Sequence, residues 1–97
     1  MSIFFMFGKY STESLKEISP ERTQRSIETI KKLQGEVRSM YTLLGEHDLV
    51  LIVDFPSVEK AMMASVALQR LTGIAFTTSP VVDVEEFDRM IGQVKDI

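Results

Sequence analysis

The chain has no cysteine and no tryptophan, and it contains one histidine and three prolines among its 97 residues. Without cysteine it forms no disulfide bond, offers no thiolate ligand to zinc and has no cysteine nucleophile. A single histidine excludes an HExxH motif and a set of several histidines holding a metal within one chain. The sequence therefore predicts neither a metal site nor a cofactor.

Basic residues are also few, since 11 lysines and arginines stand against 14 aspartates and glutamates, for a formal net charge of −3. This balance argues against a nucleic-acid backbone as a partner. No apolar run reaches the roughly 18 residues that a membrane-spanning helix needs. The apolar start ends at Gly8 and Lys9 without the basic leader or cleavage site of a signal peptide. We therefore expect a cytoplasmic protein with no nucleic-acid or membrane partner.

The composition, 44% hydrophobic and 26% charged, is that of an ordinary globular protein. A length of 97 residues argues against a multidomain enzyme. The chain also has no linker, no internal repeat and no GxGxxG, P-loop or GxSxG motif. We expect a single α+β domain over residues 1–97.

Hydrophobic periodicity predicts four strands and four helical segments. Continuous apolar runs favour strands over residues 3–10 and 48–55, and alternating patterns favour strands over 36–44 and 74–82. Helix-capping residues precede helical patterns that begin after residues 11, 19, 57 and 83. The expected buried faces of the last two helices are formed by Val58, Ala61, Met62, Ser65, Leu68 and Leu71, and by Val84, Phe87, Ile91 and Val94.

The order strand-helix-strand-strand-helix-strand predicts a ferredoxin-like fold with an extra C-terminal helix. Right-handed crossovers and a short hairpin give a four-stranded antiparallel sheet in the order 4-1-3-2, with two helices on one face. The two runs that look buried on both faces, 3–10 and 48–55, then lie in the centre. Their second face needs a cover, because large apolar patches are rare on monomers. A second copy is favoured, so we expect a homodimer, or a higher homo-oligomer, built from a dimeric α+β barrel.

Four segments of the chain resemble the GYD domain family. They read FGKYS at 7–11, SPERT at 19–23, LLGEHDLVLIV at 43–53 and LTGIAFTT at 71–78. The resemblance extends over residues 3–87 and implies a small dimeric α+β barrel protein without an established reaction. The family's signature usually has tyrosine where this chain has His47, so no role that needs a phenol there is implied. Parts of the last two segments also resemble the ligand-sensing effector domain of leucine-responsive regulators.

The most polar cluster in an apolar neighbourhood is the turn that contains His47 and Asp48. His47 is a candidate proton carrier near neutral pH, oriented by a carboxylate. The favoured alternative is a plain hairpin turn, in which Gly45 supplies a special dihedral and Asp48 accepts backbone N–H bonds. Polar groups on the preceding strand are candidates for a small-molecule pocket. The candidate ligand-binding residues are Ser39, Tyr41, His47 and Asp48, and the candidate catalytic residues are His47 and Tyr41.

These patterns predict a module that binds an apolar or weakly polar small molecule, or that serves assembly or regulation. One alternative is a cofactor-free barrel enzyme, monooxygenase- or isomerase-like, with His47 and Tyr41 as acid and base. Another is a stand-alone effector domain that senses an amino acid between subunits. A filled interior would refute both the enzyme and an internal ligand site.

Overall fold

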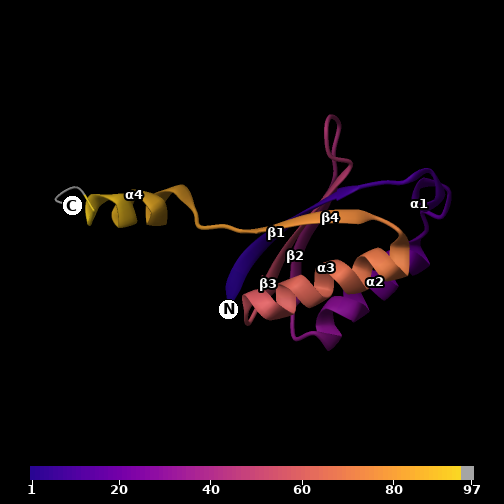
Figure 1. The fold of residues 1–97 in the computed structure, drawn as a ribbon, viewed down its shortest axis with the longest axis horizontal. Helices are drawn as coiled ribbons and strands as arrows, with labels where there is room; N and C mark the ends of the chain where they lie inside the picture. The colour runs from indigo at the N-terminus through magenta and orange to yellow at the C-terminus, as the bar shows by residue number, and fades with distance from the viewer. Residues whose placement is uncertain (95–97) are drawn as a thin grey trace.

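A computed structural model describes residues 1–94 as a four-stranded antiparallel sheet with two helices packed on one face (Figure 1). The sheet order is β2-β3-β1-β4, which reads 4-1-3-2 from the opposite edge. The α+β, ferredoxin-like architecture and the C-terminal helix expected from the sequence are present. The elements are β1 (Ser2–Lys9), α1 (Thr12–Lys16), α2 (Pro20–Lys32), β2 (Glu36–Thr42), β3 (Leu49–Phe55), α3 (Val58–Thr72), β4 (Ala75–Pro80) and α4 (Val84–Gly92).

Helix boundaries follow local capping signals. Ser11, Ser19 and Ser57 precede α1, α2 and α3, and each hydroxyl accepts a hydrogen bond from a backbone N–H of the first turn. The Asp83 carboxylate does the same for α4, at 2.8 Å. Gly73 ends α3 with a φ of 76°, a conformation that glycine adopts without strain. These signals are short-range, so the sequence alone located them.

The hydrophobic core lies between the helices and one face of the sheet. The Phe4 and Phe55 rings meet edge to face there, with centroids 5.8 Å apart. Gly35 permits the close approach of α2 to this pair, because an added Cβ would lie 2.6 Å from the Phe55 ring and 2.8 Å from Ile30. The core cluster contains Phe4, Met6, Ile30, Leu51, Val53, Phe55, Ala61, Ala64 and Leu68.

The opposite face of the sheet, which we call the open face, has no covering layer within residues 1–94. Along β1 the residues that point to the helices are buried, whereas Ile3, Phe5 and Phe7 on the open face are half-buried. One chain therefore buries residues 3–10 on one face only, and burial of the second face, which was expected to come from a second copy, stays a prediction. β3 is closer to being buried on both faces, since Val50 on its open side is 7% exposed.

α3 buries only part of the expected face. Ala61 and Leu68 are buried as predicted, whereas Val58, Met62 and Leu71 are exposed, Met62 by 63%. The helix is apolar on several sides, so periodicity could not decide which side meets the sheet. Small residues occupy much of the side that faces the sheet, because they let the helix approach the strands closely. The buried residues of α3 are Ala61, Ala64, Leu68 and Thr72.

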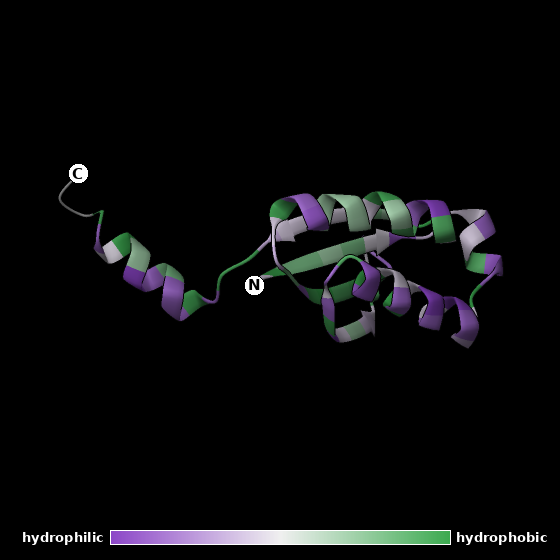
Figure 2. Ribbon diagram, turned by 90° about the horizontal axis from the view of Figure 1, so that it is seen from below, coloured by the Kyte–Doolittle hydropathy of each residue, from purple (hydrophilic) through white to green (hydrophobic). Residues whose placement is uncertain are grey.

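α4 extends away from the sheet and lies beyond the body of the domain (Figure 1). The C-terminal helix predicted from the sequence exists, but none of its residues is buried. The expected inner face of this helix is therefore exposed, since nothing in the described part of the chain covers it. Figure 2 shows strongly hydrophobic and strongly hydrophilic residues side by side on this isolated helix. The exposed fractions are 74% for Val84, 51% for Phe87, 48% for Ile91 and 47% for Val94.

Candidate functional site

The open face has an apolar centre and polar edges. The register pairs residues of the four strands into rows, and paired residues share a face. In two of the rows on the open face, the two central strands supply apolar side chains and the two edge strands supply hydroxyl groups, whereas in the row of Ile3 the central strand β3 supplies Asp54. In the order β2, β3, β1, β4 the rows are Tyr41, Val50, Phe7 and Thr77, and Ser39, Ile52, Phe5 and Ser79.

His47 lies in the β2–β3 hairpin, at one end of the open face. Its imidazole packs on the Phe7 ring, with centroids 5.0 Å apart and an interplanar angle of 33°. A hollow beside it is lined by residues that include Lys9, Glu46 and Thr77. Within residues 1–94 no ion pair joins the imidazole to a carboxylate. The aromatic contact, rather than an orienting acid, fixes the ring.

Asp48 joins the hairpin to the end of β1. Its Oδ2 accepts a hydrogen bond from the Tyr10 backbone N–H at 2.9 Å. Lys9 Nζ lies 4.0 Å from the same oxygen and donates to the Glu46 carbonyl at 3.0 Å. Gly45 has a φ of 125°, which a residue with a side chain rarely adopts. These contacts match the hairpin-turn interpretation that the sequence favoured.

A charged pair lies on the open face at a distance from the hairpin. Arg38 Nε donates to Asp54 Oδ2 at 2.5 Å, and Asp54 is 8% exposed. The hydrogen bond to Asp54 and its negative charge raise the pKa of Arg38 above its ordinary value. Sequence reasoning missed this pair. The available signal was an aspartate inside an apolar strand, which requires a partner when it is buried.

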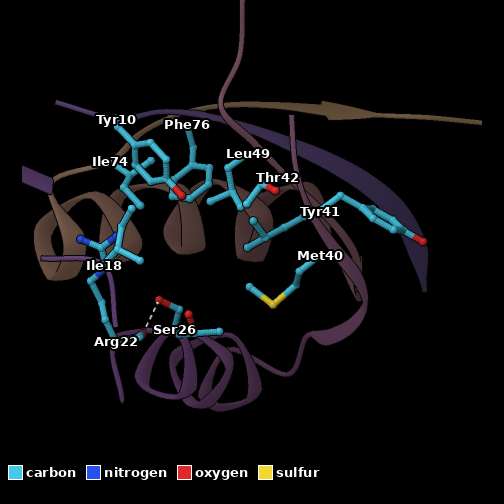
Figure 3. A pocket seen from close by; sticks show the side chains of 12 residues that line it. Tyr10, Ile18, Arg22, Ser26, Met40, Tyr41, Thr42, Leu49, Ile74 and Phe76 are labelled. Atoms are coloured by element: carbon cyan, nitrogen blue, oxygen red, sulfur yellow. Dashed lines mark hydrogen bonds between the residues drawn. The ribbon is translucent and has the colours of Figure 1, made fainter. Parts of the chain in front are cut away.

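The four candidate residues do not meet in one cavity. Ser39 and Tyr41 lie on edge strand β2, and the hollow at His47 is lined by neither of them nor by Asp48. The Tyr41 ring is 57% exposed and points away from the space between β2 and α2 (Figure 3). One chain therefore does not bring His47 and Tyr41 together around a single hollow.

A cavity that the sequence did not indicate lies on the helix side of the sheet. It has a volume of about 210 Å³ and lies between α2 and the strands (Figure 3). We call it the α2 cavity. Its apolar wall is formed by Ile18, Met40, Leu49, Leu51, Ile74 and Phe76.

The α2 cavity also has a polar side. The hydroxyls of Tyr10 and Thr42 point into it (Figure 3). Ser26 Oγ donates to the Arg22 carbonyl at 2.9 Å. Arg22 itself is 7% exposed, and its Nη1 donates to the Ser14 carbonyl at 2.5 Å. Residues 22, 26 and 30 are spaced four apart, which places them on one face of α2 and could have indicated that this face is buried. The charge of Arg22 suggested an exposed position instead.

Other kinds of site are not found in the described part of the chain. Residues 1–94 contain no group of three or more histidine, cysteine, aspartate or glutamate side chains that could hold a metal ion. None of the helices described is both long enough and apolar enough to cross a membrane.

A sequence model of the GYD domain matches residues 4–91. The chain belongs to the GYD domain family. The match spans the sheet, α2, α3 and most of α4, and it agrees with the resemblance carried by the four sequence segments. No curated protein matches this GYD chain significantly.

The GYD chain also resembles solved structures of larger regulators. A transcriptional regulator superposes with a TM-score of 0.64 at 17% identity, over 87% of the GYD chain and 52% of the regulator. The leucine response regulatory protein of Mycobacterium tuberculosis gives a TM-score of 0.57 at 13% identity, over 86% and 51%. At such identities the similarity shows the fold alone. The GYD chain spans about half the length of these proteins.

Proposed function

We propose that this GYD domain is a homodimeric ligand-binding module with a regulatory role. The observation that carries the proposal is the half-covered sheet. Two helices seal one face, whereas the other presents Phe5, Phe7 and Ile52 with no cover within residues 1–94. A second copy that packs open face against open face closes both sheets at once and forms an α+β barrel.

The energetics favour such a dimer. Full burial of a phenylalanine or isoleucine side chain contributes about 1.5–3 kcal/mol relative to its exposure. A small domain has a total stability of roughly 5–15 kcal/mol. Completing the burial of the half-covered row residues of the open face therefore adds a large fraction of the stability of each subunit. The two edges of the open face carry hydroxyl groups, including those of Thr77 and Tyr41. Polar groups of this kind suit the rim of an interface.

The β2–β3 hairpin supports the same arrangement. In Figure 1 it stands on the side of the sheet away from α2 and α3. Leu44 in this hairpin is fully exposed, and Leu43 is 38% exposed. An exposed leucine on an arm that projects beside an apolar sheet is well placed to contact a facing copy.

Two observations support ligand binding. The α2 cavity is lined by a mostly apolar wall with a few polar groups, which is the usual character of small-molecule sites. The fold similarity to regulators, one of them a leucine response regulatory protein, supports a sensing role. The parts of those regulators that have no counterpart in the GYD chain give no basis for proposing a further activity of this domain.

Native mass spectrometry of protein purified without denaturation tests both halves of the proposal in one experiment. We expect the mass of two chains, together with a retained small molecule of a few hundred daltons or less. A folded single chain over the whole micromolar range would contradict the dimer. Failure to detect any bound molecule, combined with no response to a metabolite library in thermal-shift assays, would contradict the ligand-binding role.

A further inference from the structure

Arg22 is a buried cation without an acidic partner. It is 7% exposed, and the ion pairs within residues 1–94 do not include it. Buried arginines are normally paired with an anion, because removing the charge from water is costly. The guanidinium has five N–H donors, and one bond to the Ser14 carbonyl accounts for only part of them. No side-chain nitrogen or oxygen of the described residues is both buried and unpaired, so the remaining donors of Arg22 reach solvent. Arg22 is one of the residues that line the α2 cavity.

The polar side of the α2 cavity supplies hydrogen-bond donors and positive charge. Tyr10 and Thr42 also line the cavity, and Figure 3 shows Tyr10 on the side nearer Arg22 and Thr42 farther away, near Leu49. The lining contains no aspartate or glutamate. A molecule bound there must therefore bring acceptors and a negative charge. It must not bring an ammonium group, which would meet Arg22 without a counter-charge.

The charge of Arg22 and the volume of the α2 cavity further restrict the class of ligand that fits. A single arginine balances one negative charge, which suits a carboxylate better than a doubly charged phosphate ester. An apolar cavity of about 150 Å³ holds benzene, so 210 Å³ has room for such a group plus a carboxylate. The wall opposite the polar side, with Met40 and Leu51, is apolar.

We propose that the α2 cavity binds a small monocarboxylate whose apolar part has five or six carbon atoms. This inference rests on the proposed ligand-binding role and specifies the ligand class. The carboxylate pairs with the Arg22 guanidinium and accepts a hydrogen bond from the Tyr10 hydroxyl, while the apolar group packs toward Met40 and Leu51. Because the site also lacks an acid for an ammonium group, it discriminates against amino acids of the same carbon skeleton.

Three matched probes test the inference: 4-methylpentanoate, its amide 4-methylpentanamide, and leucine, which is the same acid with an added ammonium group. Binding to the full chain is measured by calorimetry at pH 7 and by NMR shifts of the cavity methyl groups. We expect the acid to bind on the order of 10- to 100-fold more tightly than the amide, the range of a hydrogen bond to a charged group. Leucine is expected to bind more weakly than the acid. Equal binding of acid and amide, tighter binding of leucine, or binding of none would overturn the inference.

Variants locate the site. Tyr10→Phe removes one hydroxyl and is expected to weaken binding of 4-methylpentanoate on the order of 3- to 10-fold. Thr77→Val is the matched control, because it removes a hydroxyl on the open face from a residue that does not line the cavity, and it should leave the affinity unchanged. Arg22→Gln is expected to abolish the preference for acid over amide. Its fold is checked by circular dichroism, since Arg22 also holds the Ser14 carbonyl.

The result separates this inference from the proposed function. If native mass spectrometry finds a retained uncharged molecule while the three probes fail, the ligand class is wrong and the binding role stands. If no retained molecule is detected and no probe binds, both the proposed ligand class and the proposed ligand-binding role are wrong.

A second, independent inference starts from α4. Its apolar stripe is exposed along the whole helix, and α4 carries three acidic residues and one basic residue. The outer side of α3 is also exposed and apolar, with Met62, Met63 and Val66 exposed by 63%, 51% and 52%. A groove on this side is bordered by Arg70. The two surfaces are both apolar, and Arg70 beside the groove is opposite in charge to the acidic residues of α4.

The two surfaces of one chain do not meet. The Val81 N–H is bonded to the Ile3 carbonyl at 3.1 Å, which continues the β1–β4 pairing to the residue before the α4 linker. From there the chain leads away from the body (Figure 1). We infer that α4 docks on the outer side of α3 in a second copy of the chain, with its acidic residues near Arg70.

Disulfide trapping tests this exchange directly, because the chain has no native cysteine. Two single variants, Met63→Cys and Ile91→Cys, are mixed under mild oxidation. We expect a heterodimer linked through a disulfide, whereas the control mixture of Glu28→Cys, an exposed residue of α2, and Ile91→Cys should give much less. No linkage above the control would overturn the inference, as would a double variant that forms the bond only within one chain.

Discussion

The two faces of the sheet are built from alternate residues of the same strands, yet they differ in completeness. On the helix side, Met6 and Val53 are fully buried and surrounded by α2 and α3. On the open side, Phe5 and Ile52 have similar apolar character but are only half-buried. The difference teaches that one chain supplies two apolar layers and covers only one of them. We propose that a partner copy covers the second layer.

The largest effects on folding and assembly are expected when a charge is introduced into one face of the sheet or the other. Leu51→Lys places a cation in the core, where Leu51 is 1% exposed, and we expect the chain to unfold at every concentration. The physical reason is that an unpaired charge in the core cannot be solvated. Circular dichroism should show loss of helix at 25 °C, and a cooperative native-like melt would contradict the assignment of Leu51 to the core.

Phe5→Lys places the same charge on the open face. The lysine stem can reach solvent in a single chain, so we expect the subunits to separate while they stay folded. The loss of the buried aromatic surface should lower stability by about 1.5–3 kcal/mol. Light scattering checks the mass and urea denaturation checks the stability. An intact dimer with unchanged stability would mean that the open face is not the interface.

A smaller effect is expected at the glycine that sets the packing of the covered face. Gly35→Ala adds a methyl group 2.6 Å from the Phe55 ring, and overpacking of this kind costs about 1–3 kcal/mol. Gly92→Ala, with no atom within 4 Å of the added group, is the matched control and should not lower stability. Thermal denaturation of the two variants compares them. Equal melting temperatures would contradict the tight packing of α2 on Phe55.

The smallest effects are expected in the hairpin beside the open face. Asp48→Ala removes the acceptor of the Tyr10 N–H and should cost about 0.5–1.5 kcal/mol. His47→Tyr keeps a ring over Phe7, so we expect normal folding and nearly unchanged stability. Urea denaturation ranks the two variants, and a larger loss for His47→Tyr would favour a specific polar role for the imidazole.

Local patterns were sufficient to predict most of the fold. Capping serines before α1, α2 and α3, Gly73 after α3, and the apolar runs of β1 and β3 act over a few residues, so the sequence reveals them directly. The packing side of α3 and the isolation of α4 were not predicted. Both depend on what lies opposite the helix in space, and a pattern that is apolar on several sides does not specify that.

The candidate site was predicted less well than the fold. The hairpin role of Asp48 follows from the residue types and was anticipated. The α2 cavity was missed, because Tyr10, Arg22 and Thr42 come from three separate segments and line one cavity only in the folded chain. The catalytic roles of His47 and Tyr41 stay a prediction, without a shared hollow in one chain to favour them.

The claim that a second copy covers the open face is tested most directly by urea denaturation at two protein concentrations a hundredfold apart. If the native state is the dimer, the apparent stability per dimer should rise by about 2.7 kcal/mol over this range, because association is linked to folding by mass action. The unfolding midpoint should then shift to higher urea at the higher concentration. Identical midpoints, with light scattering that gives the mass of one folded chain at both concentrations, would contradict the claim.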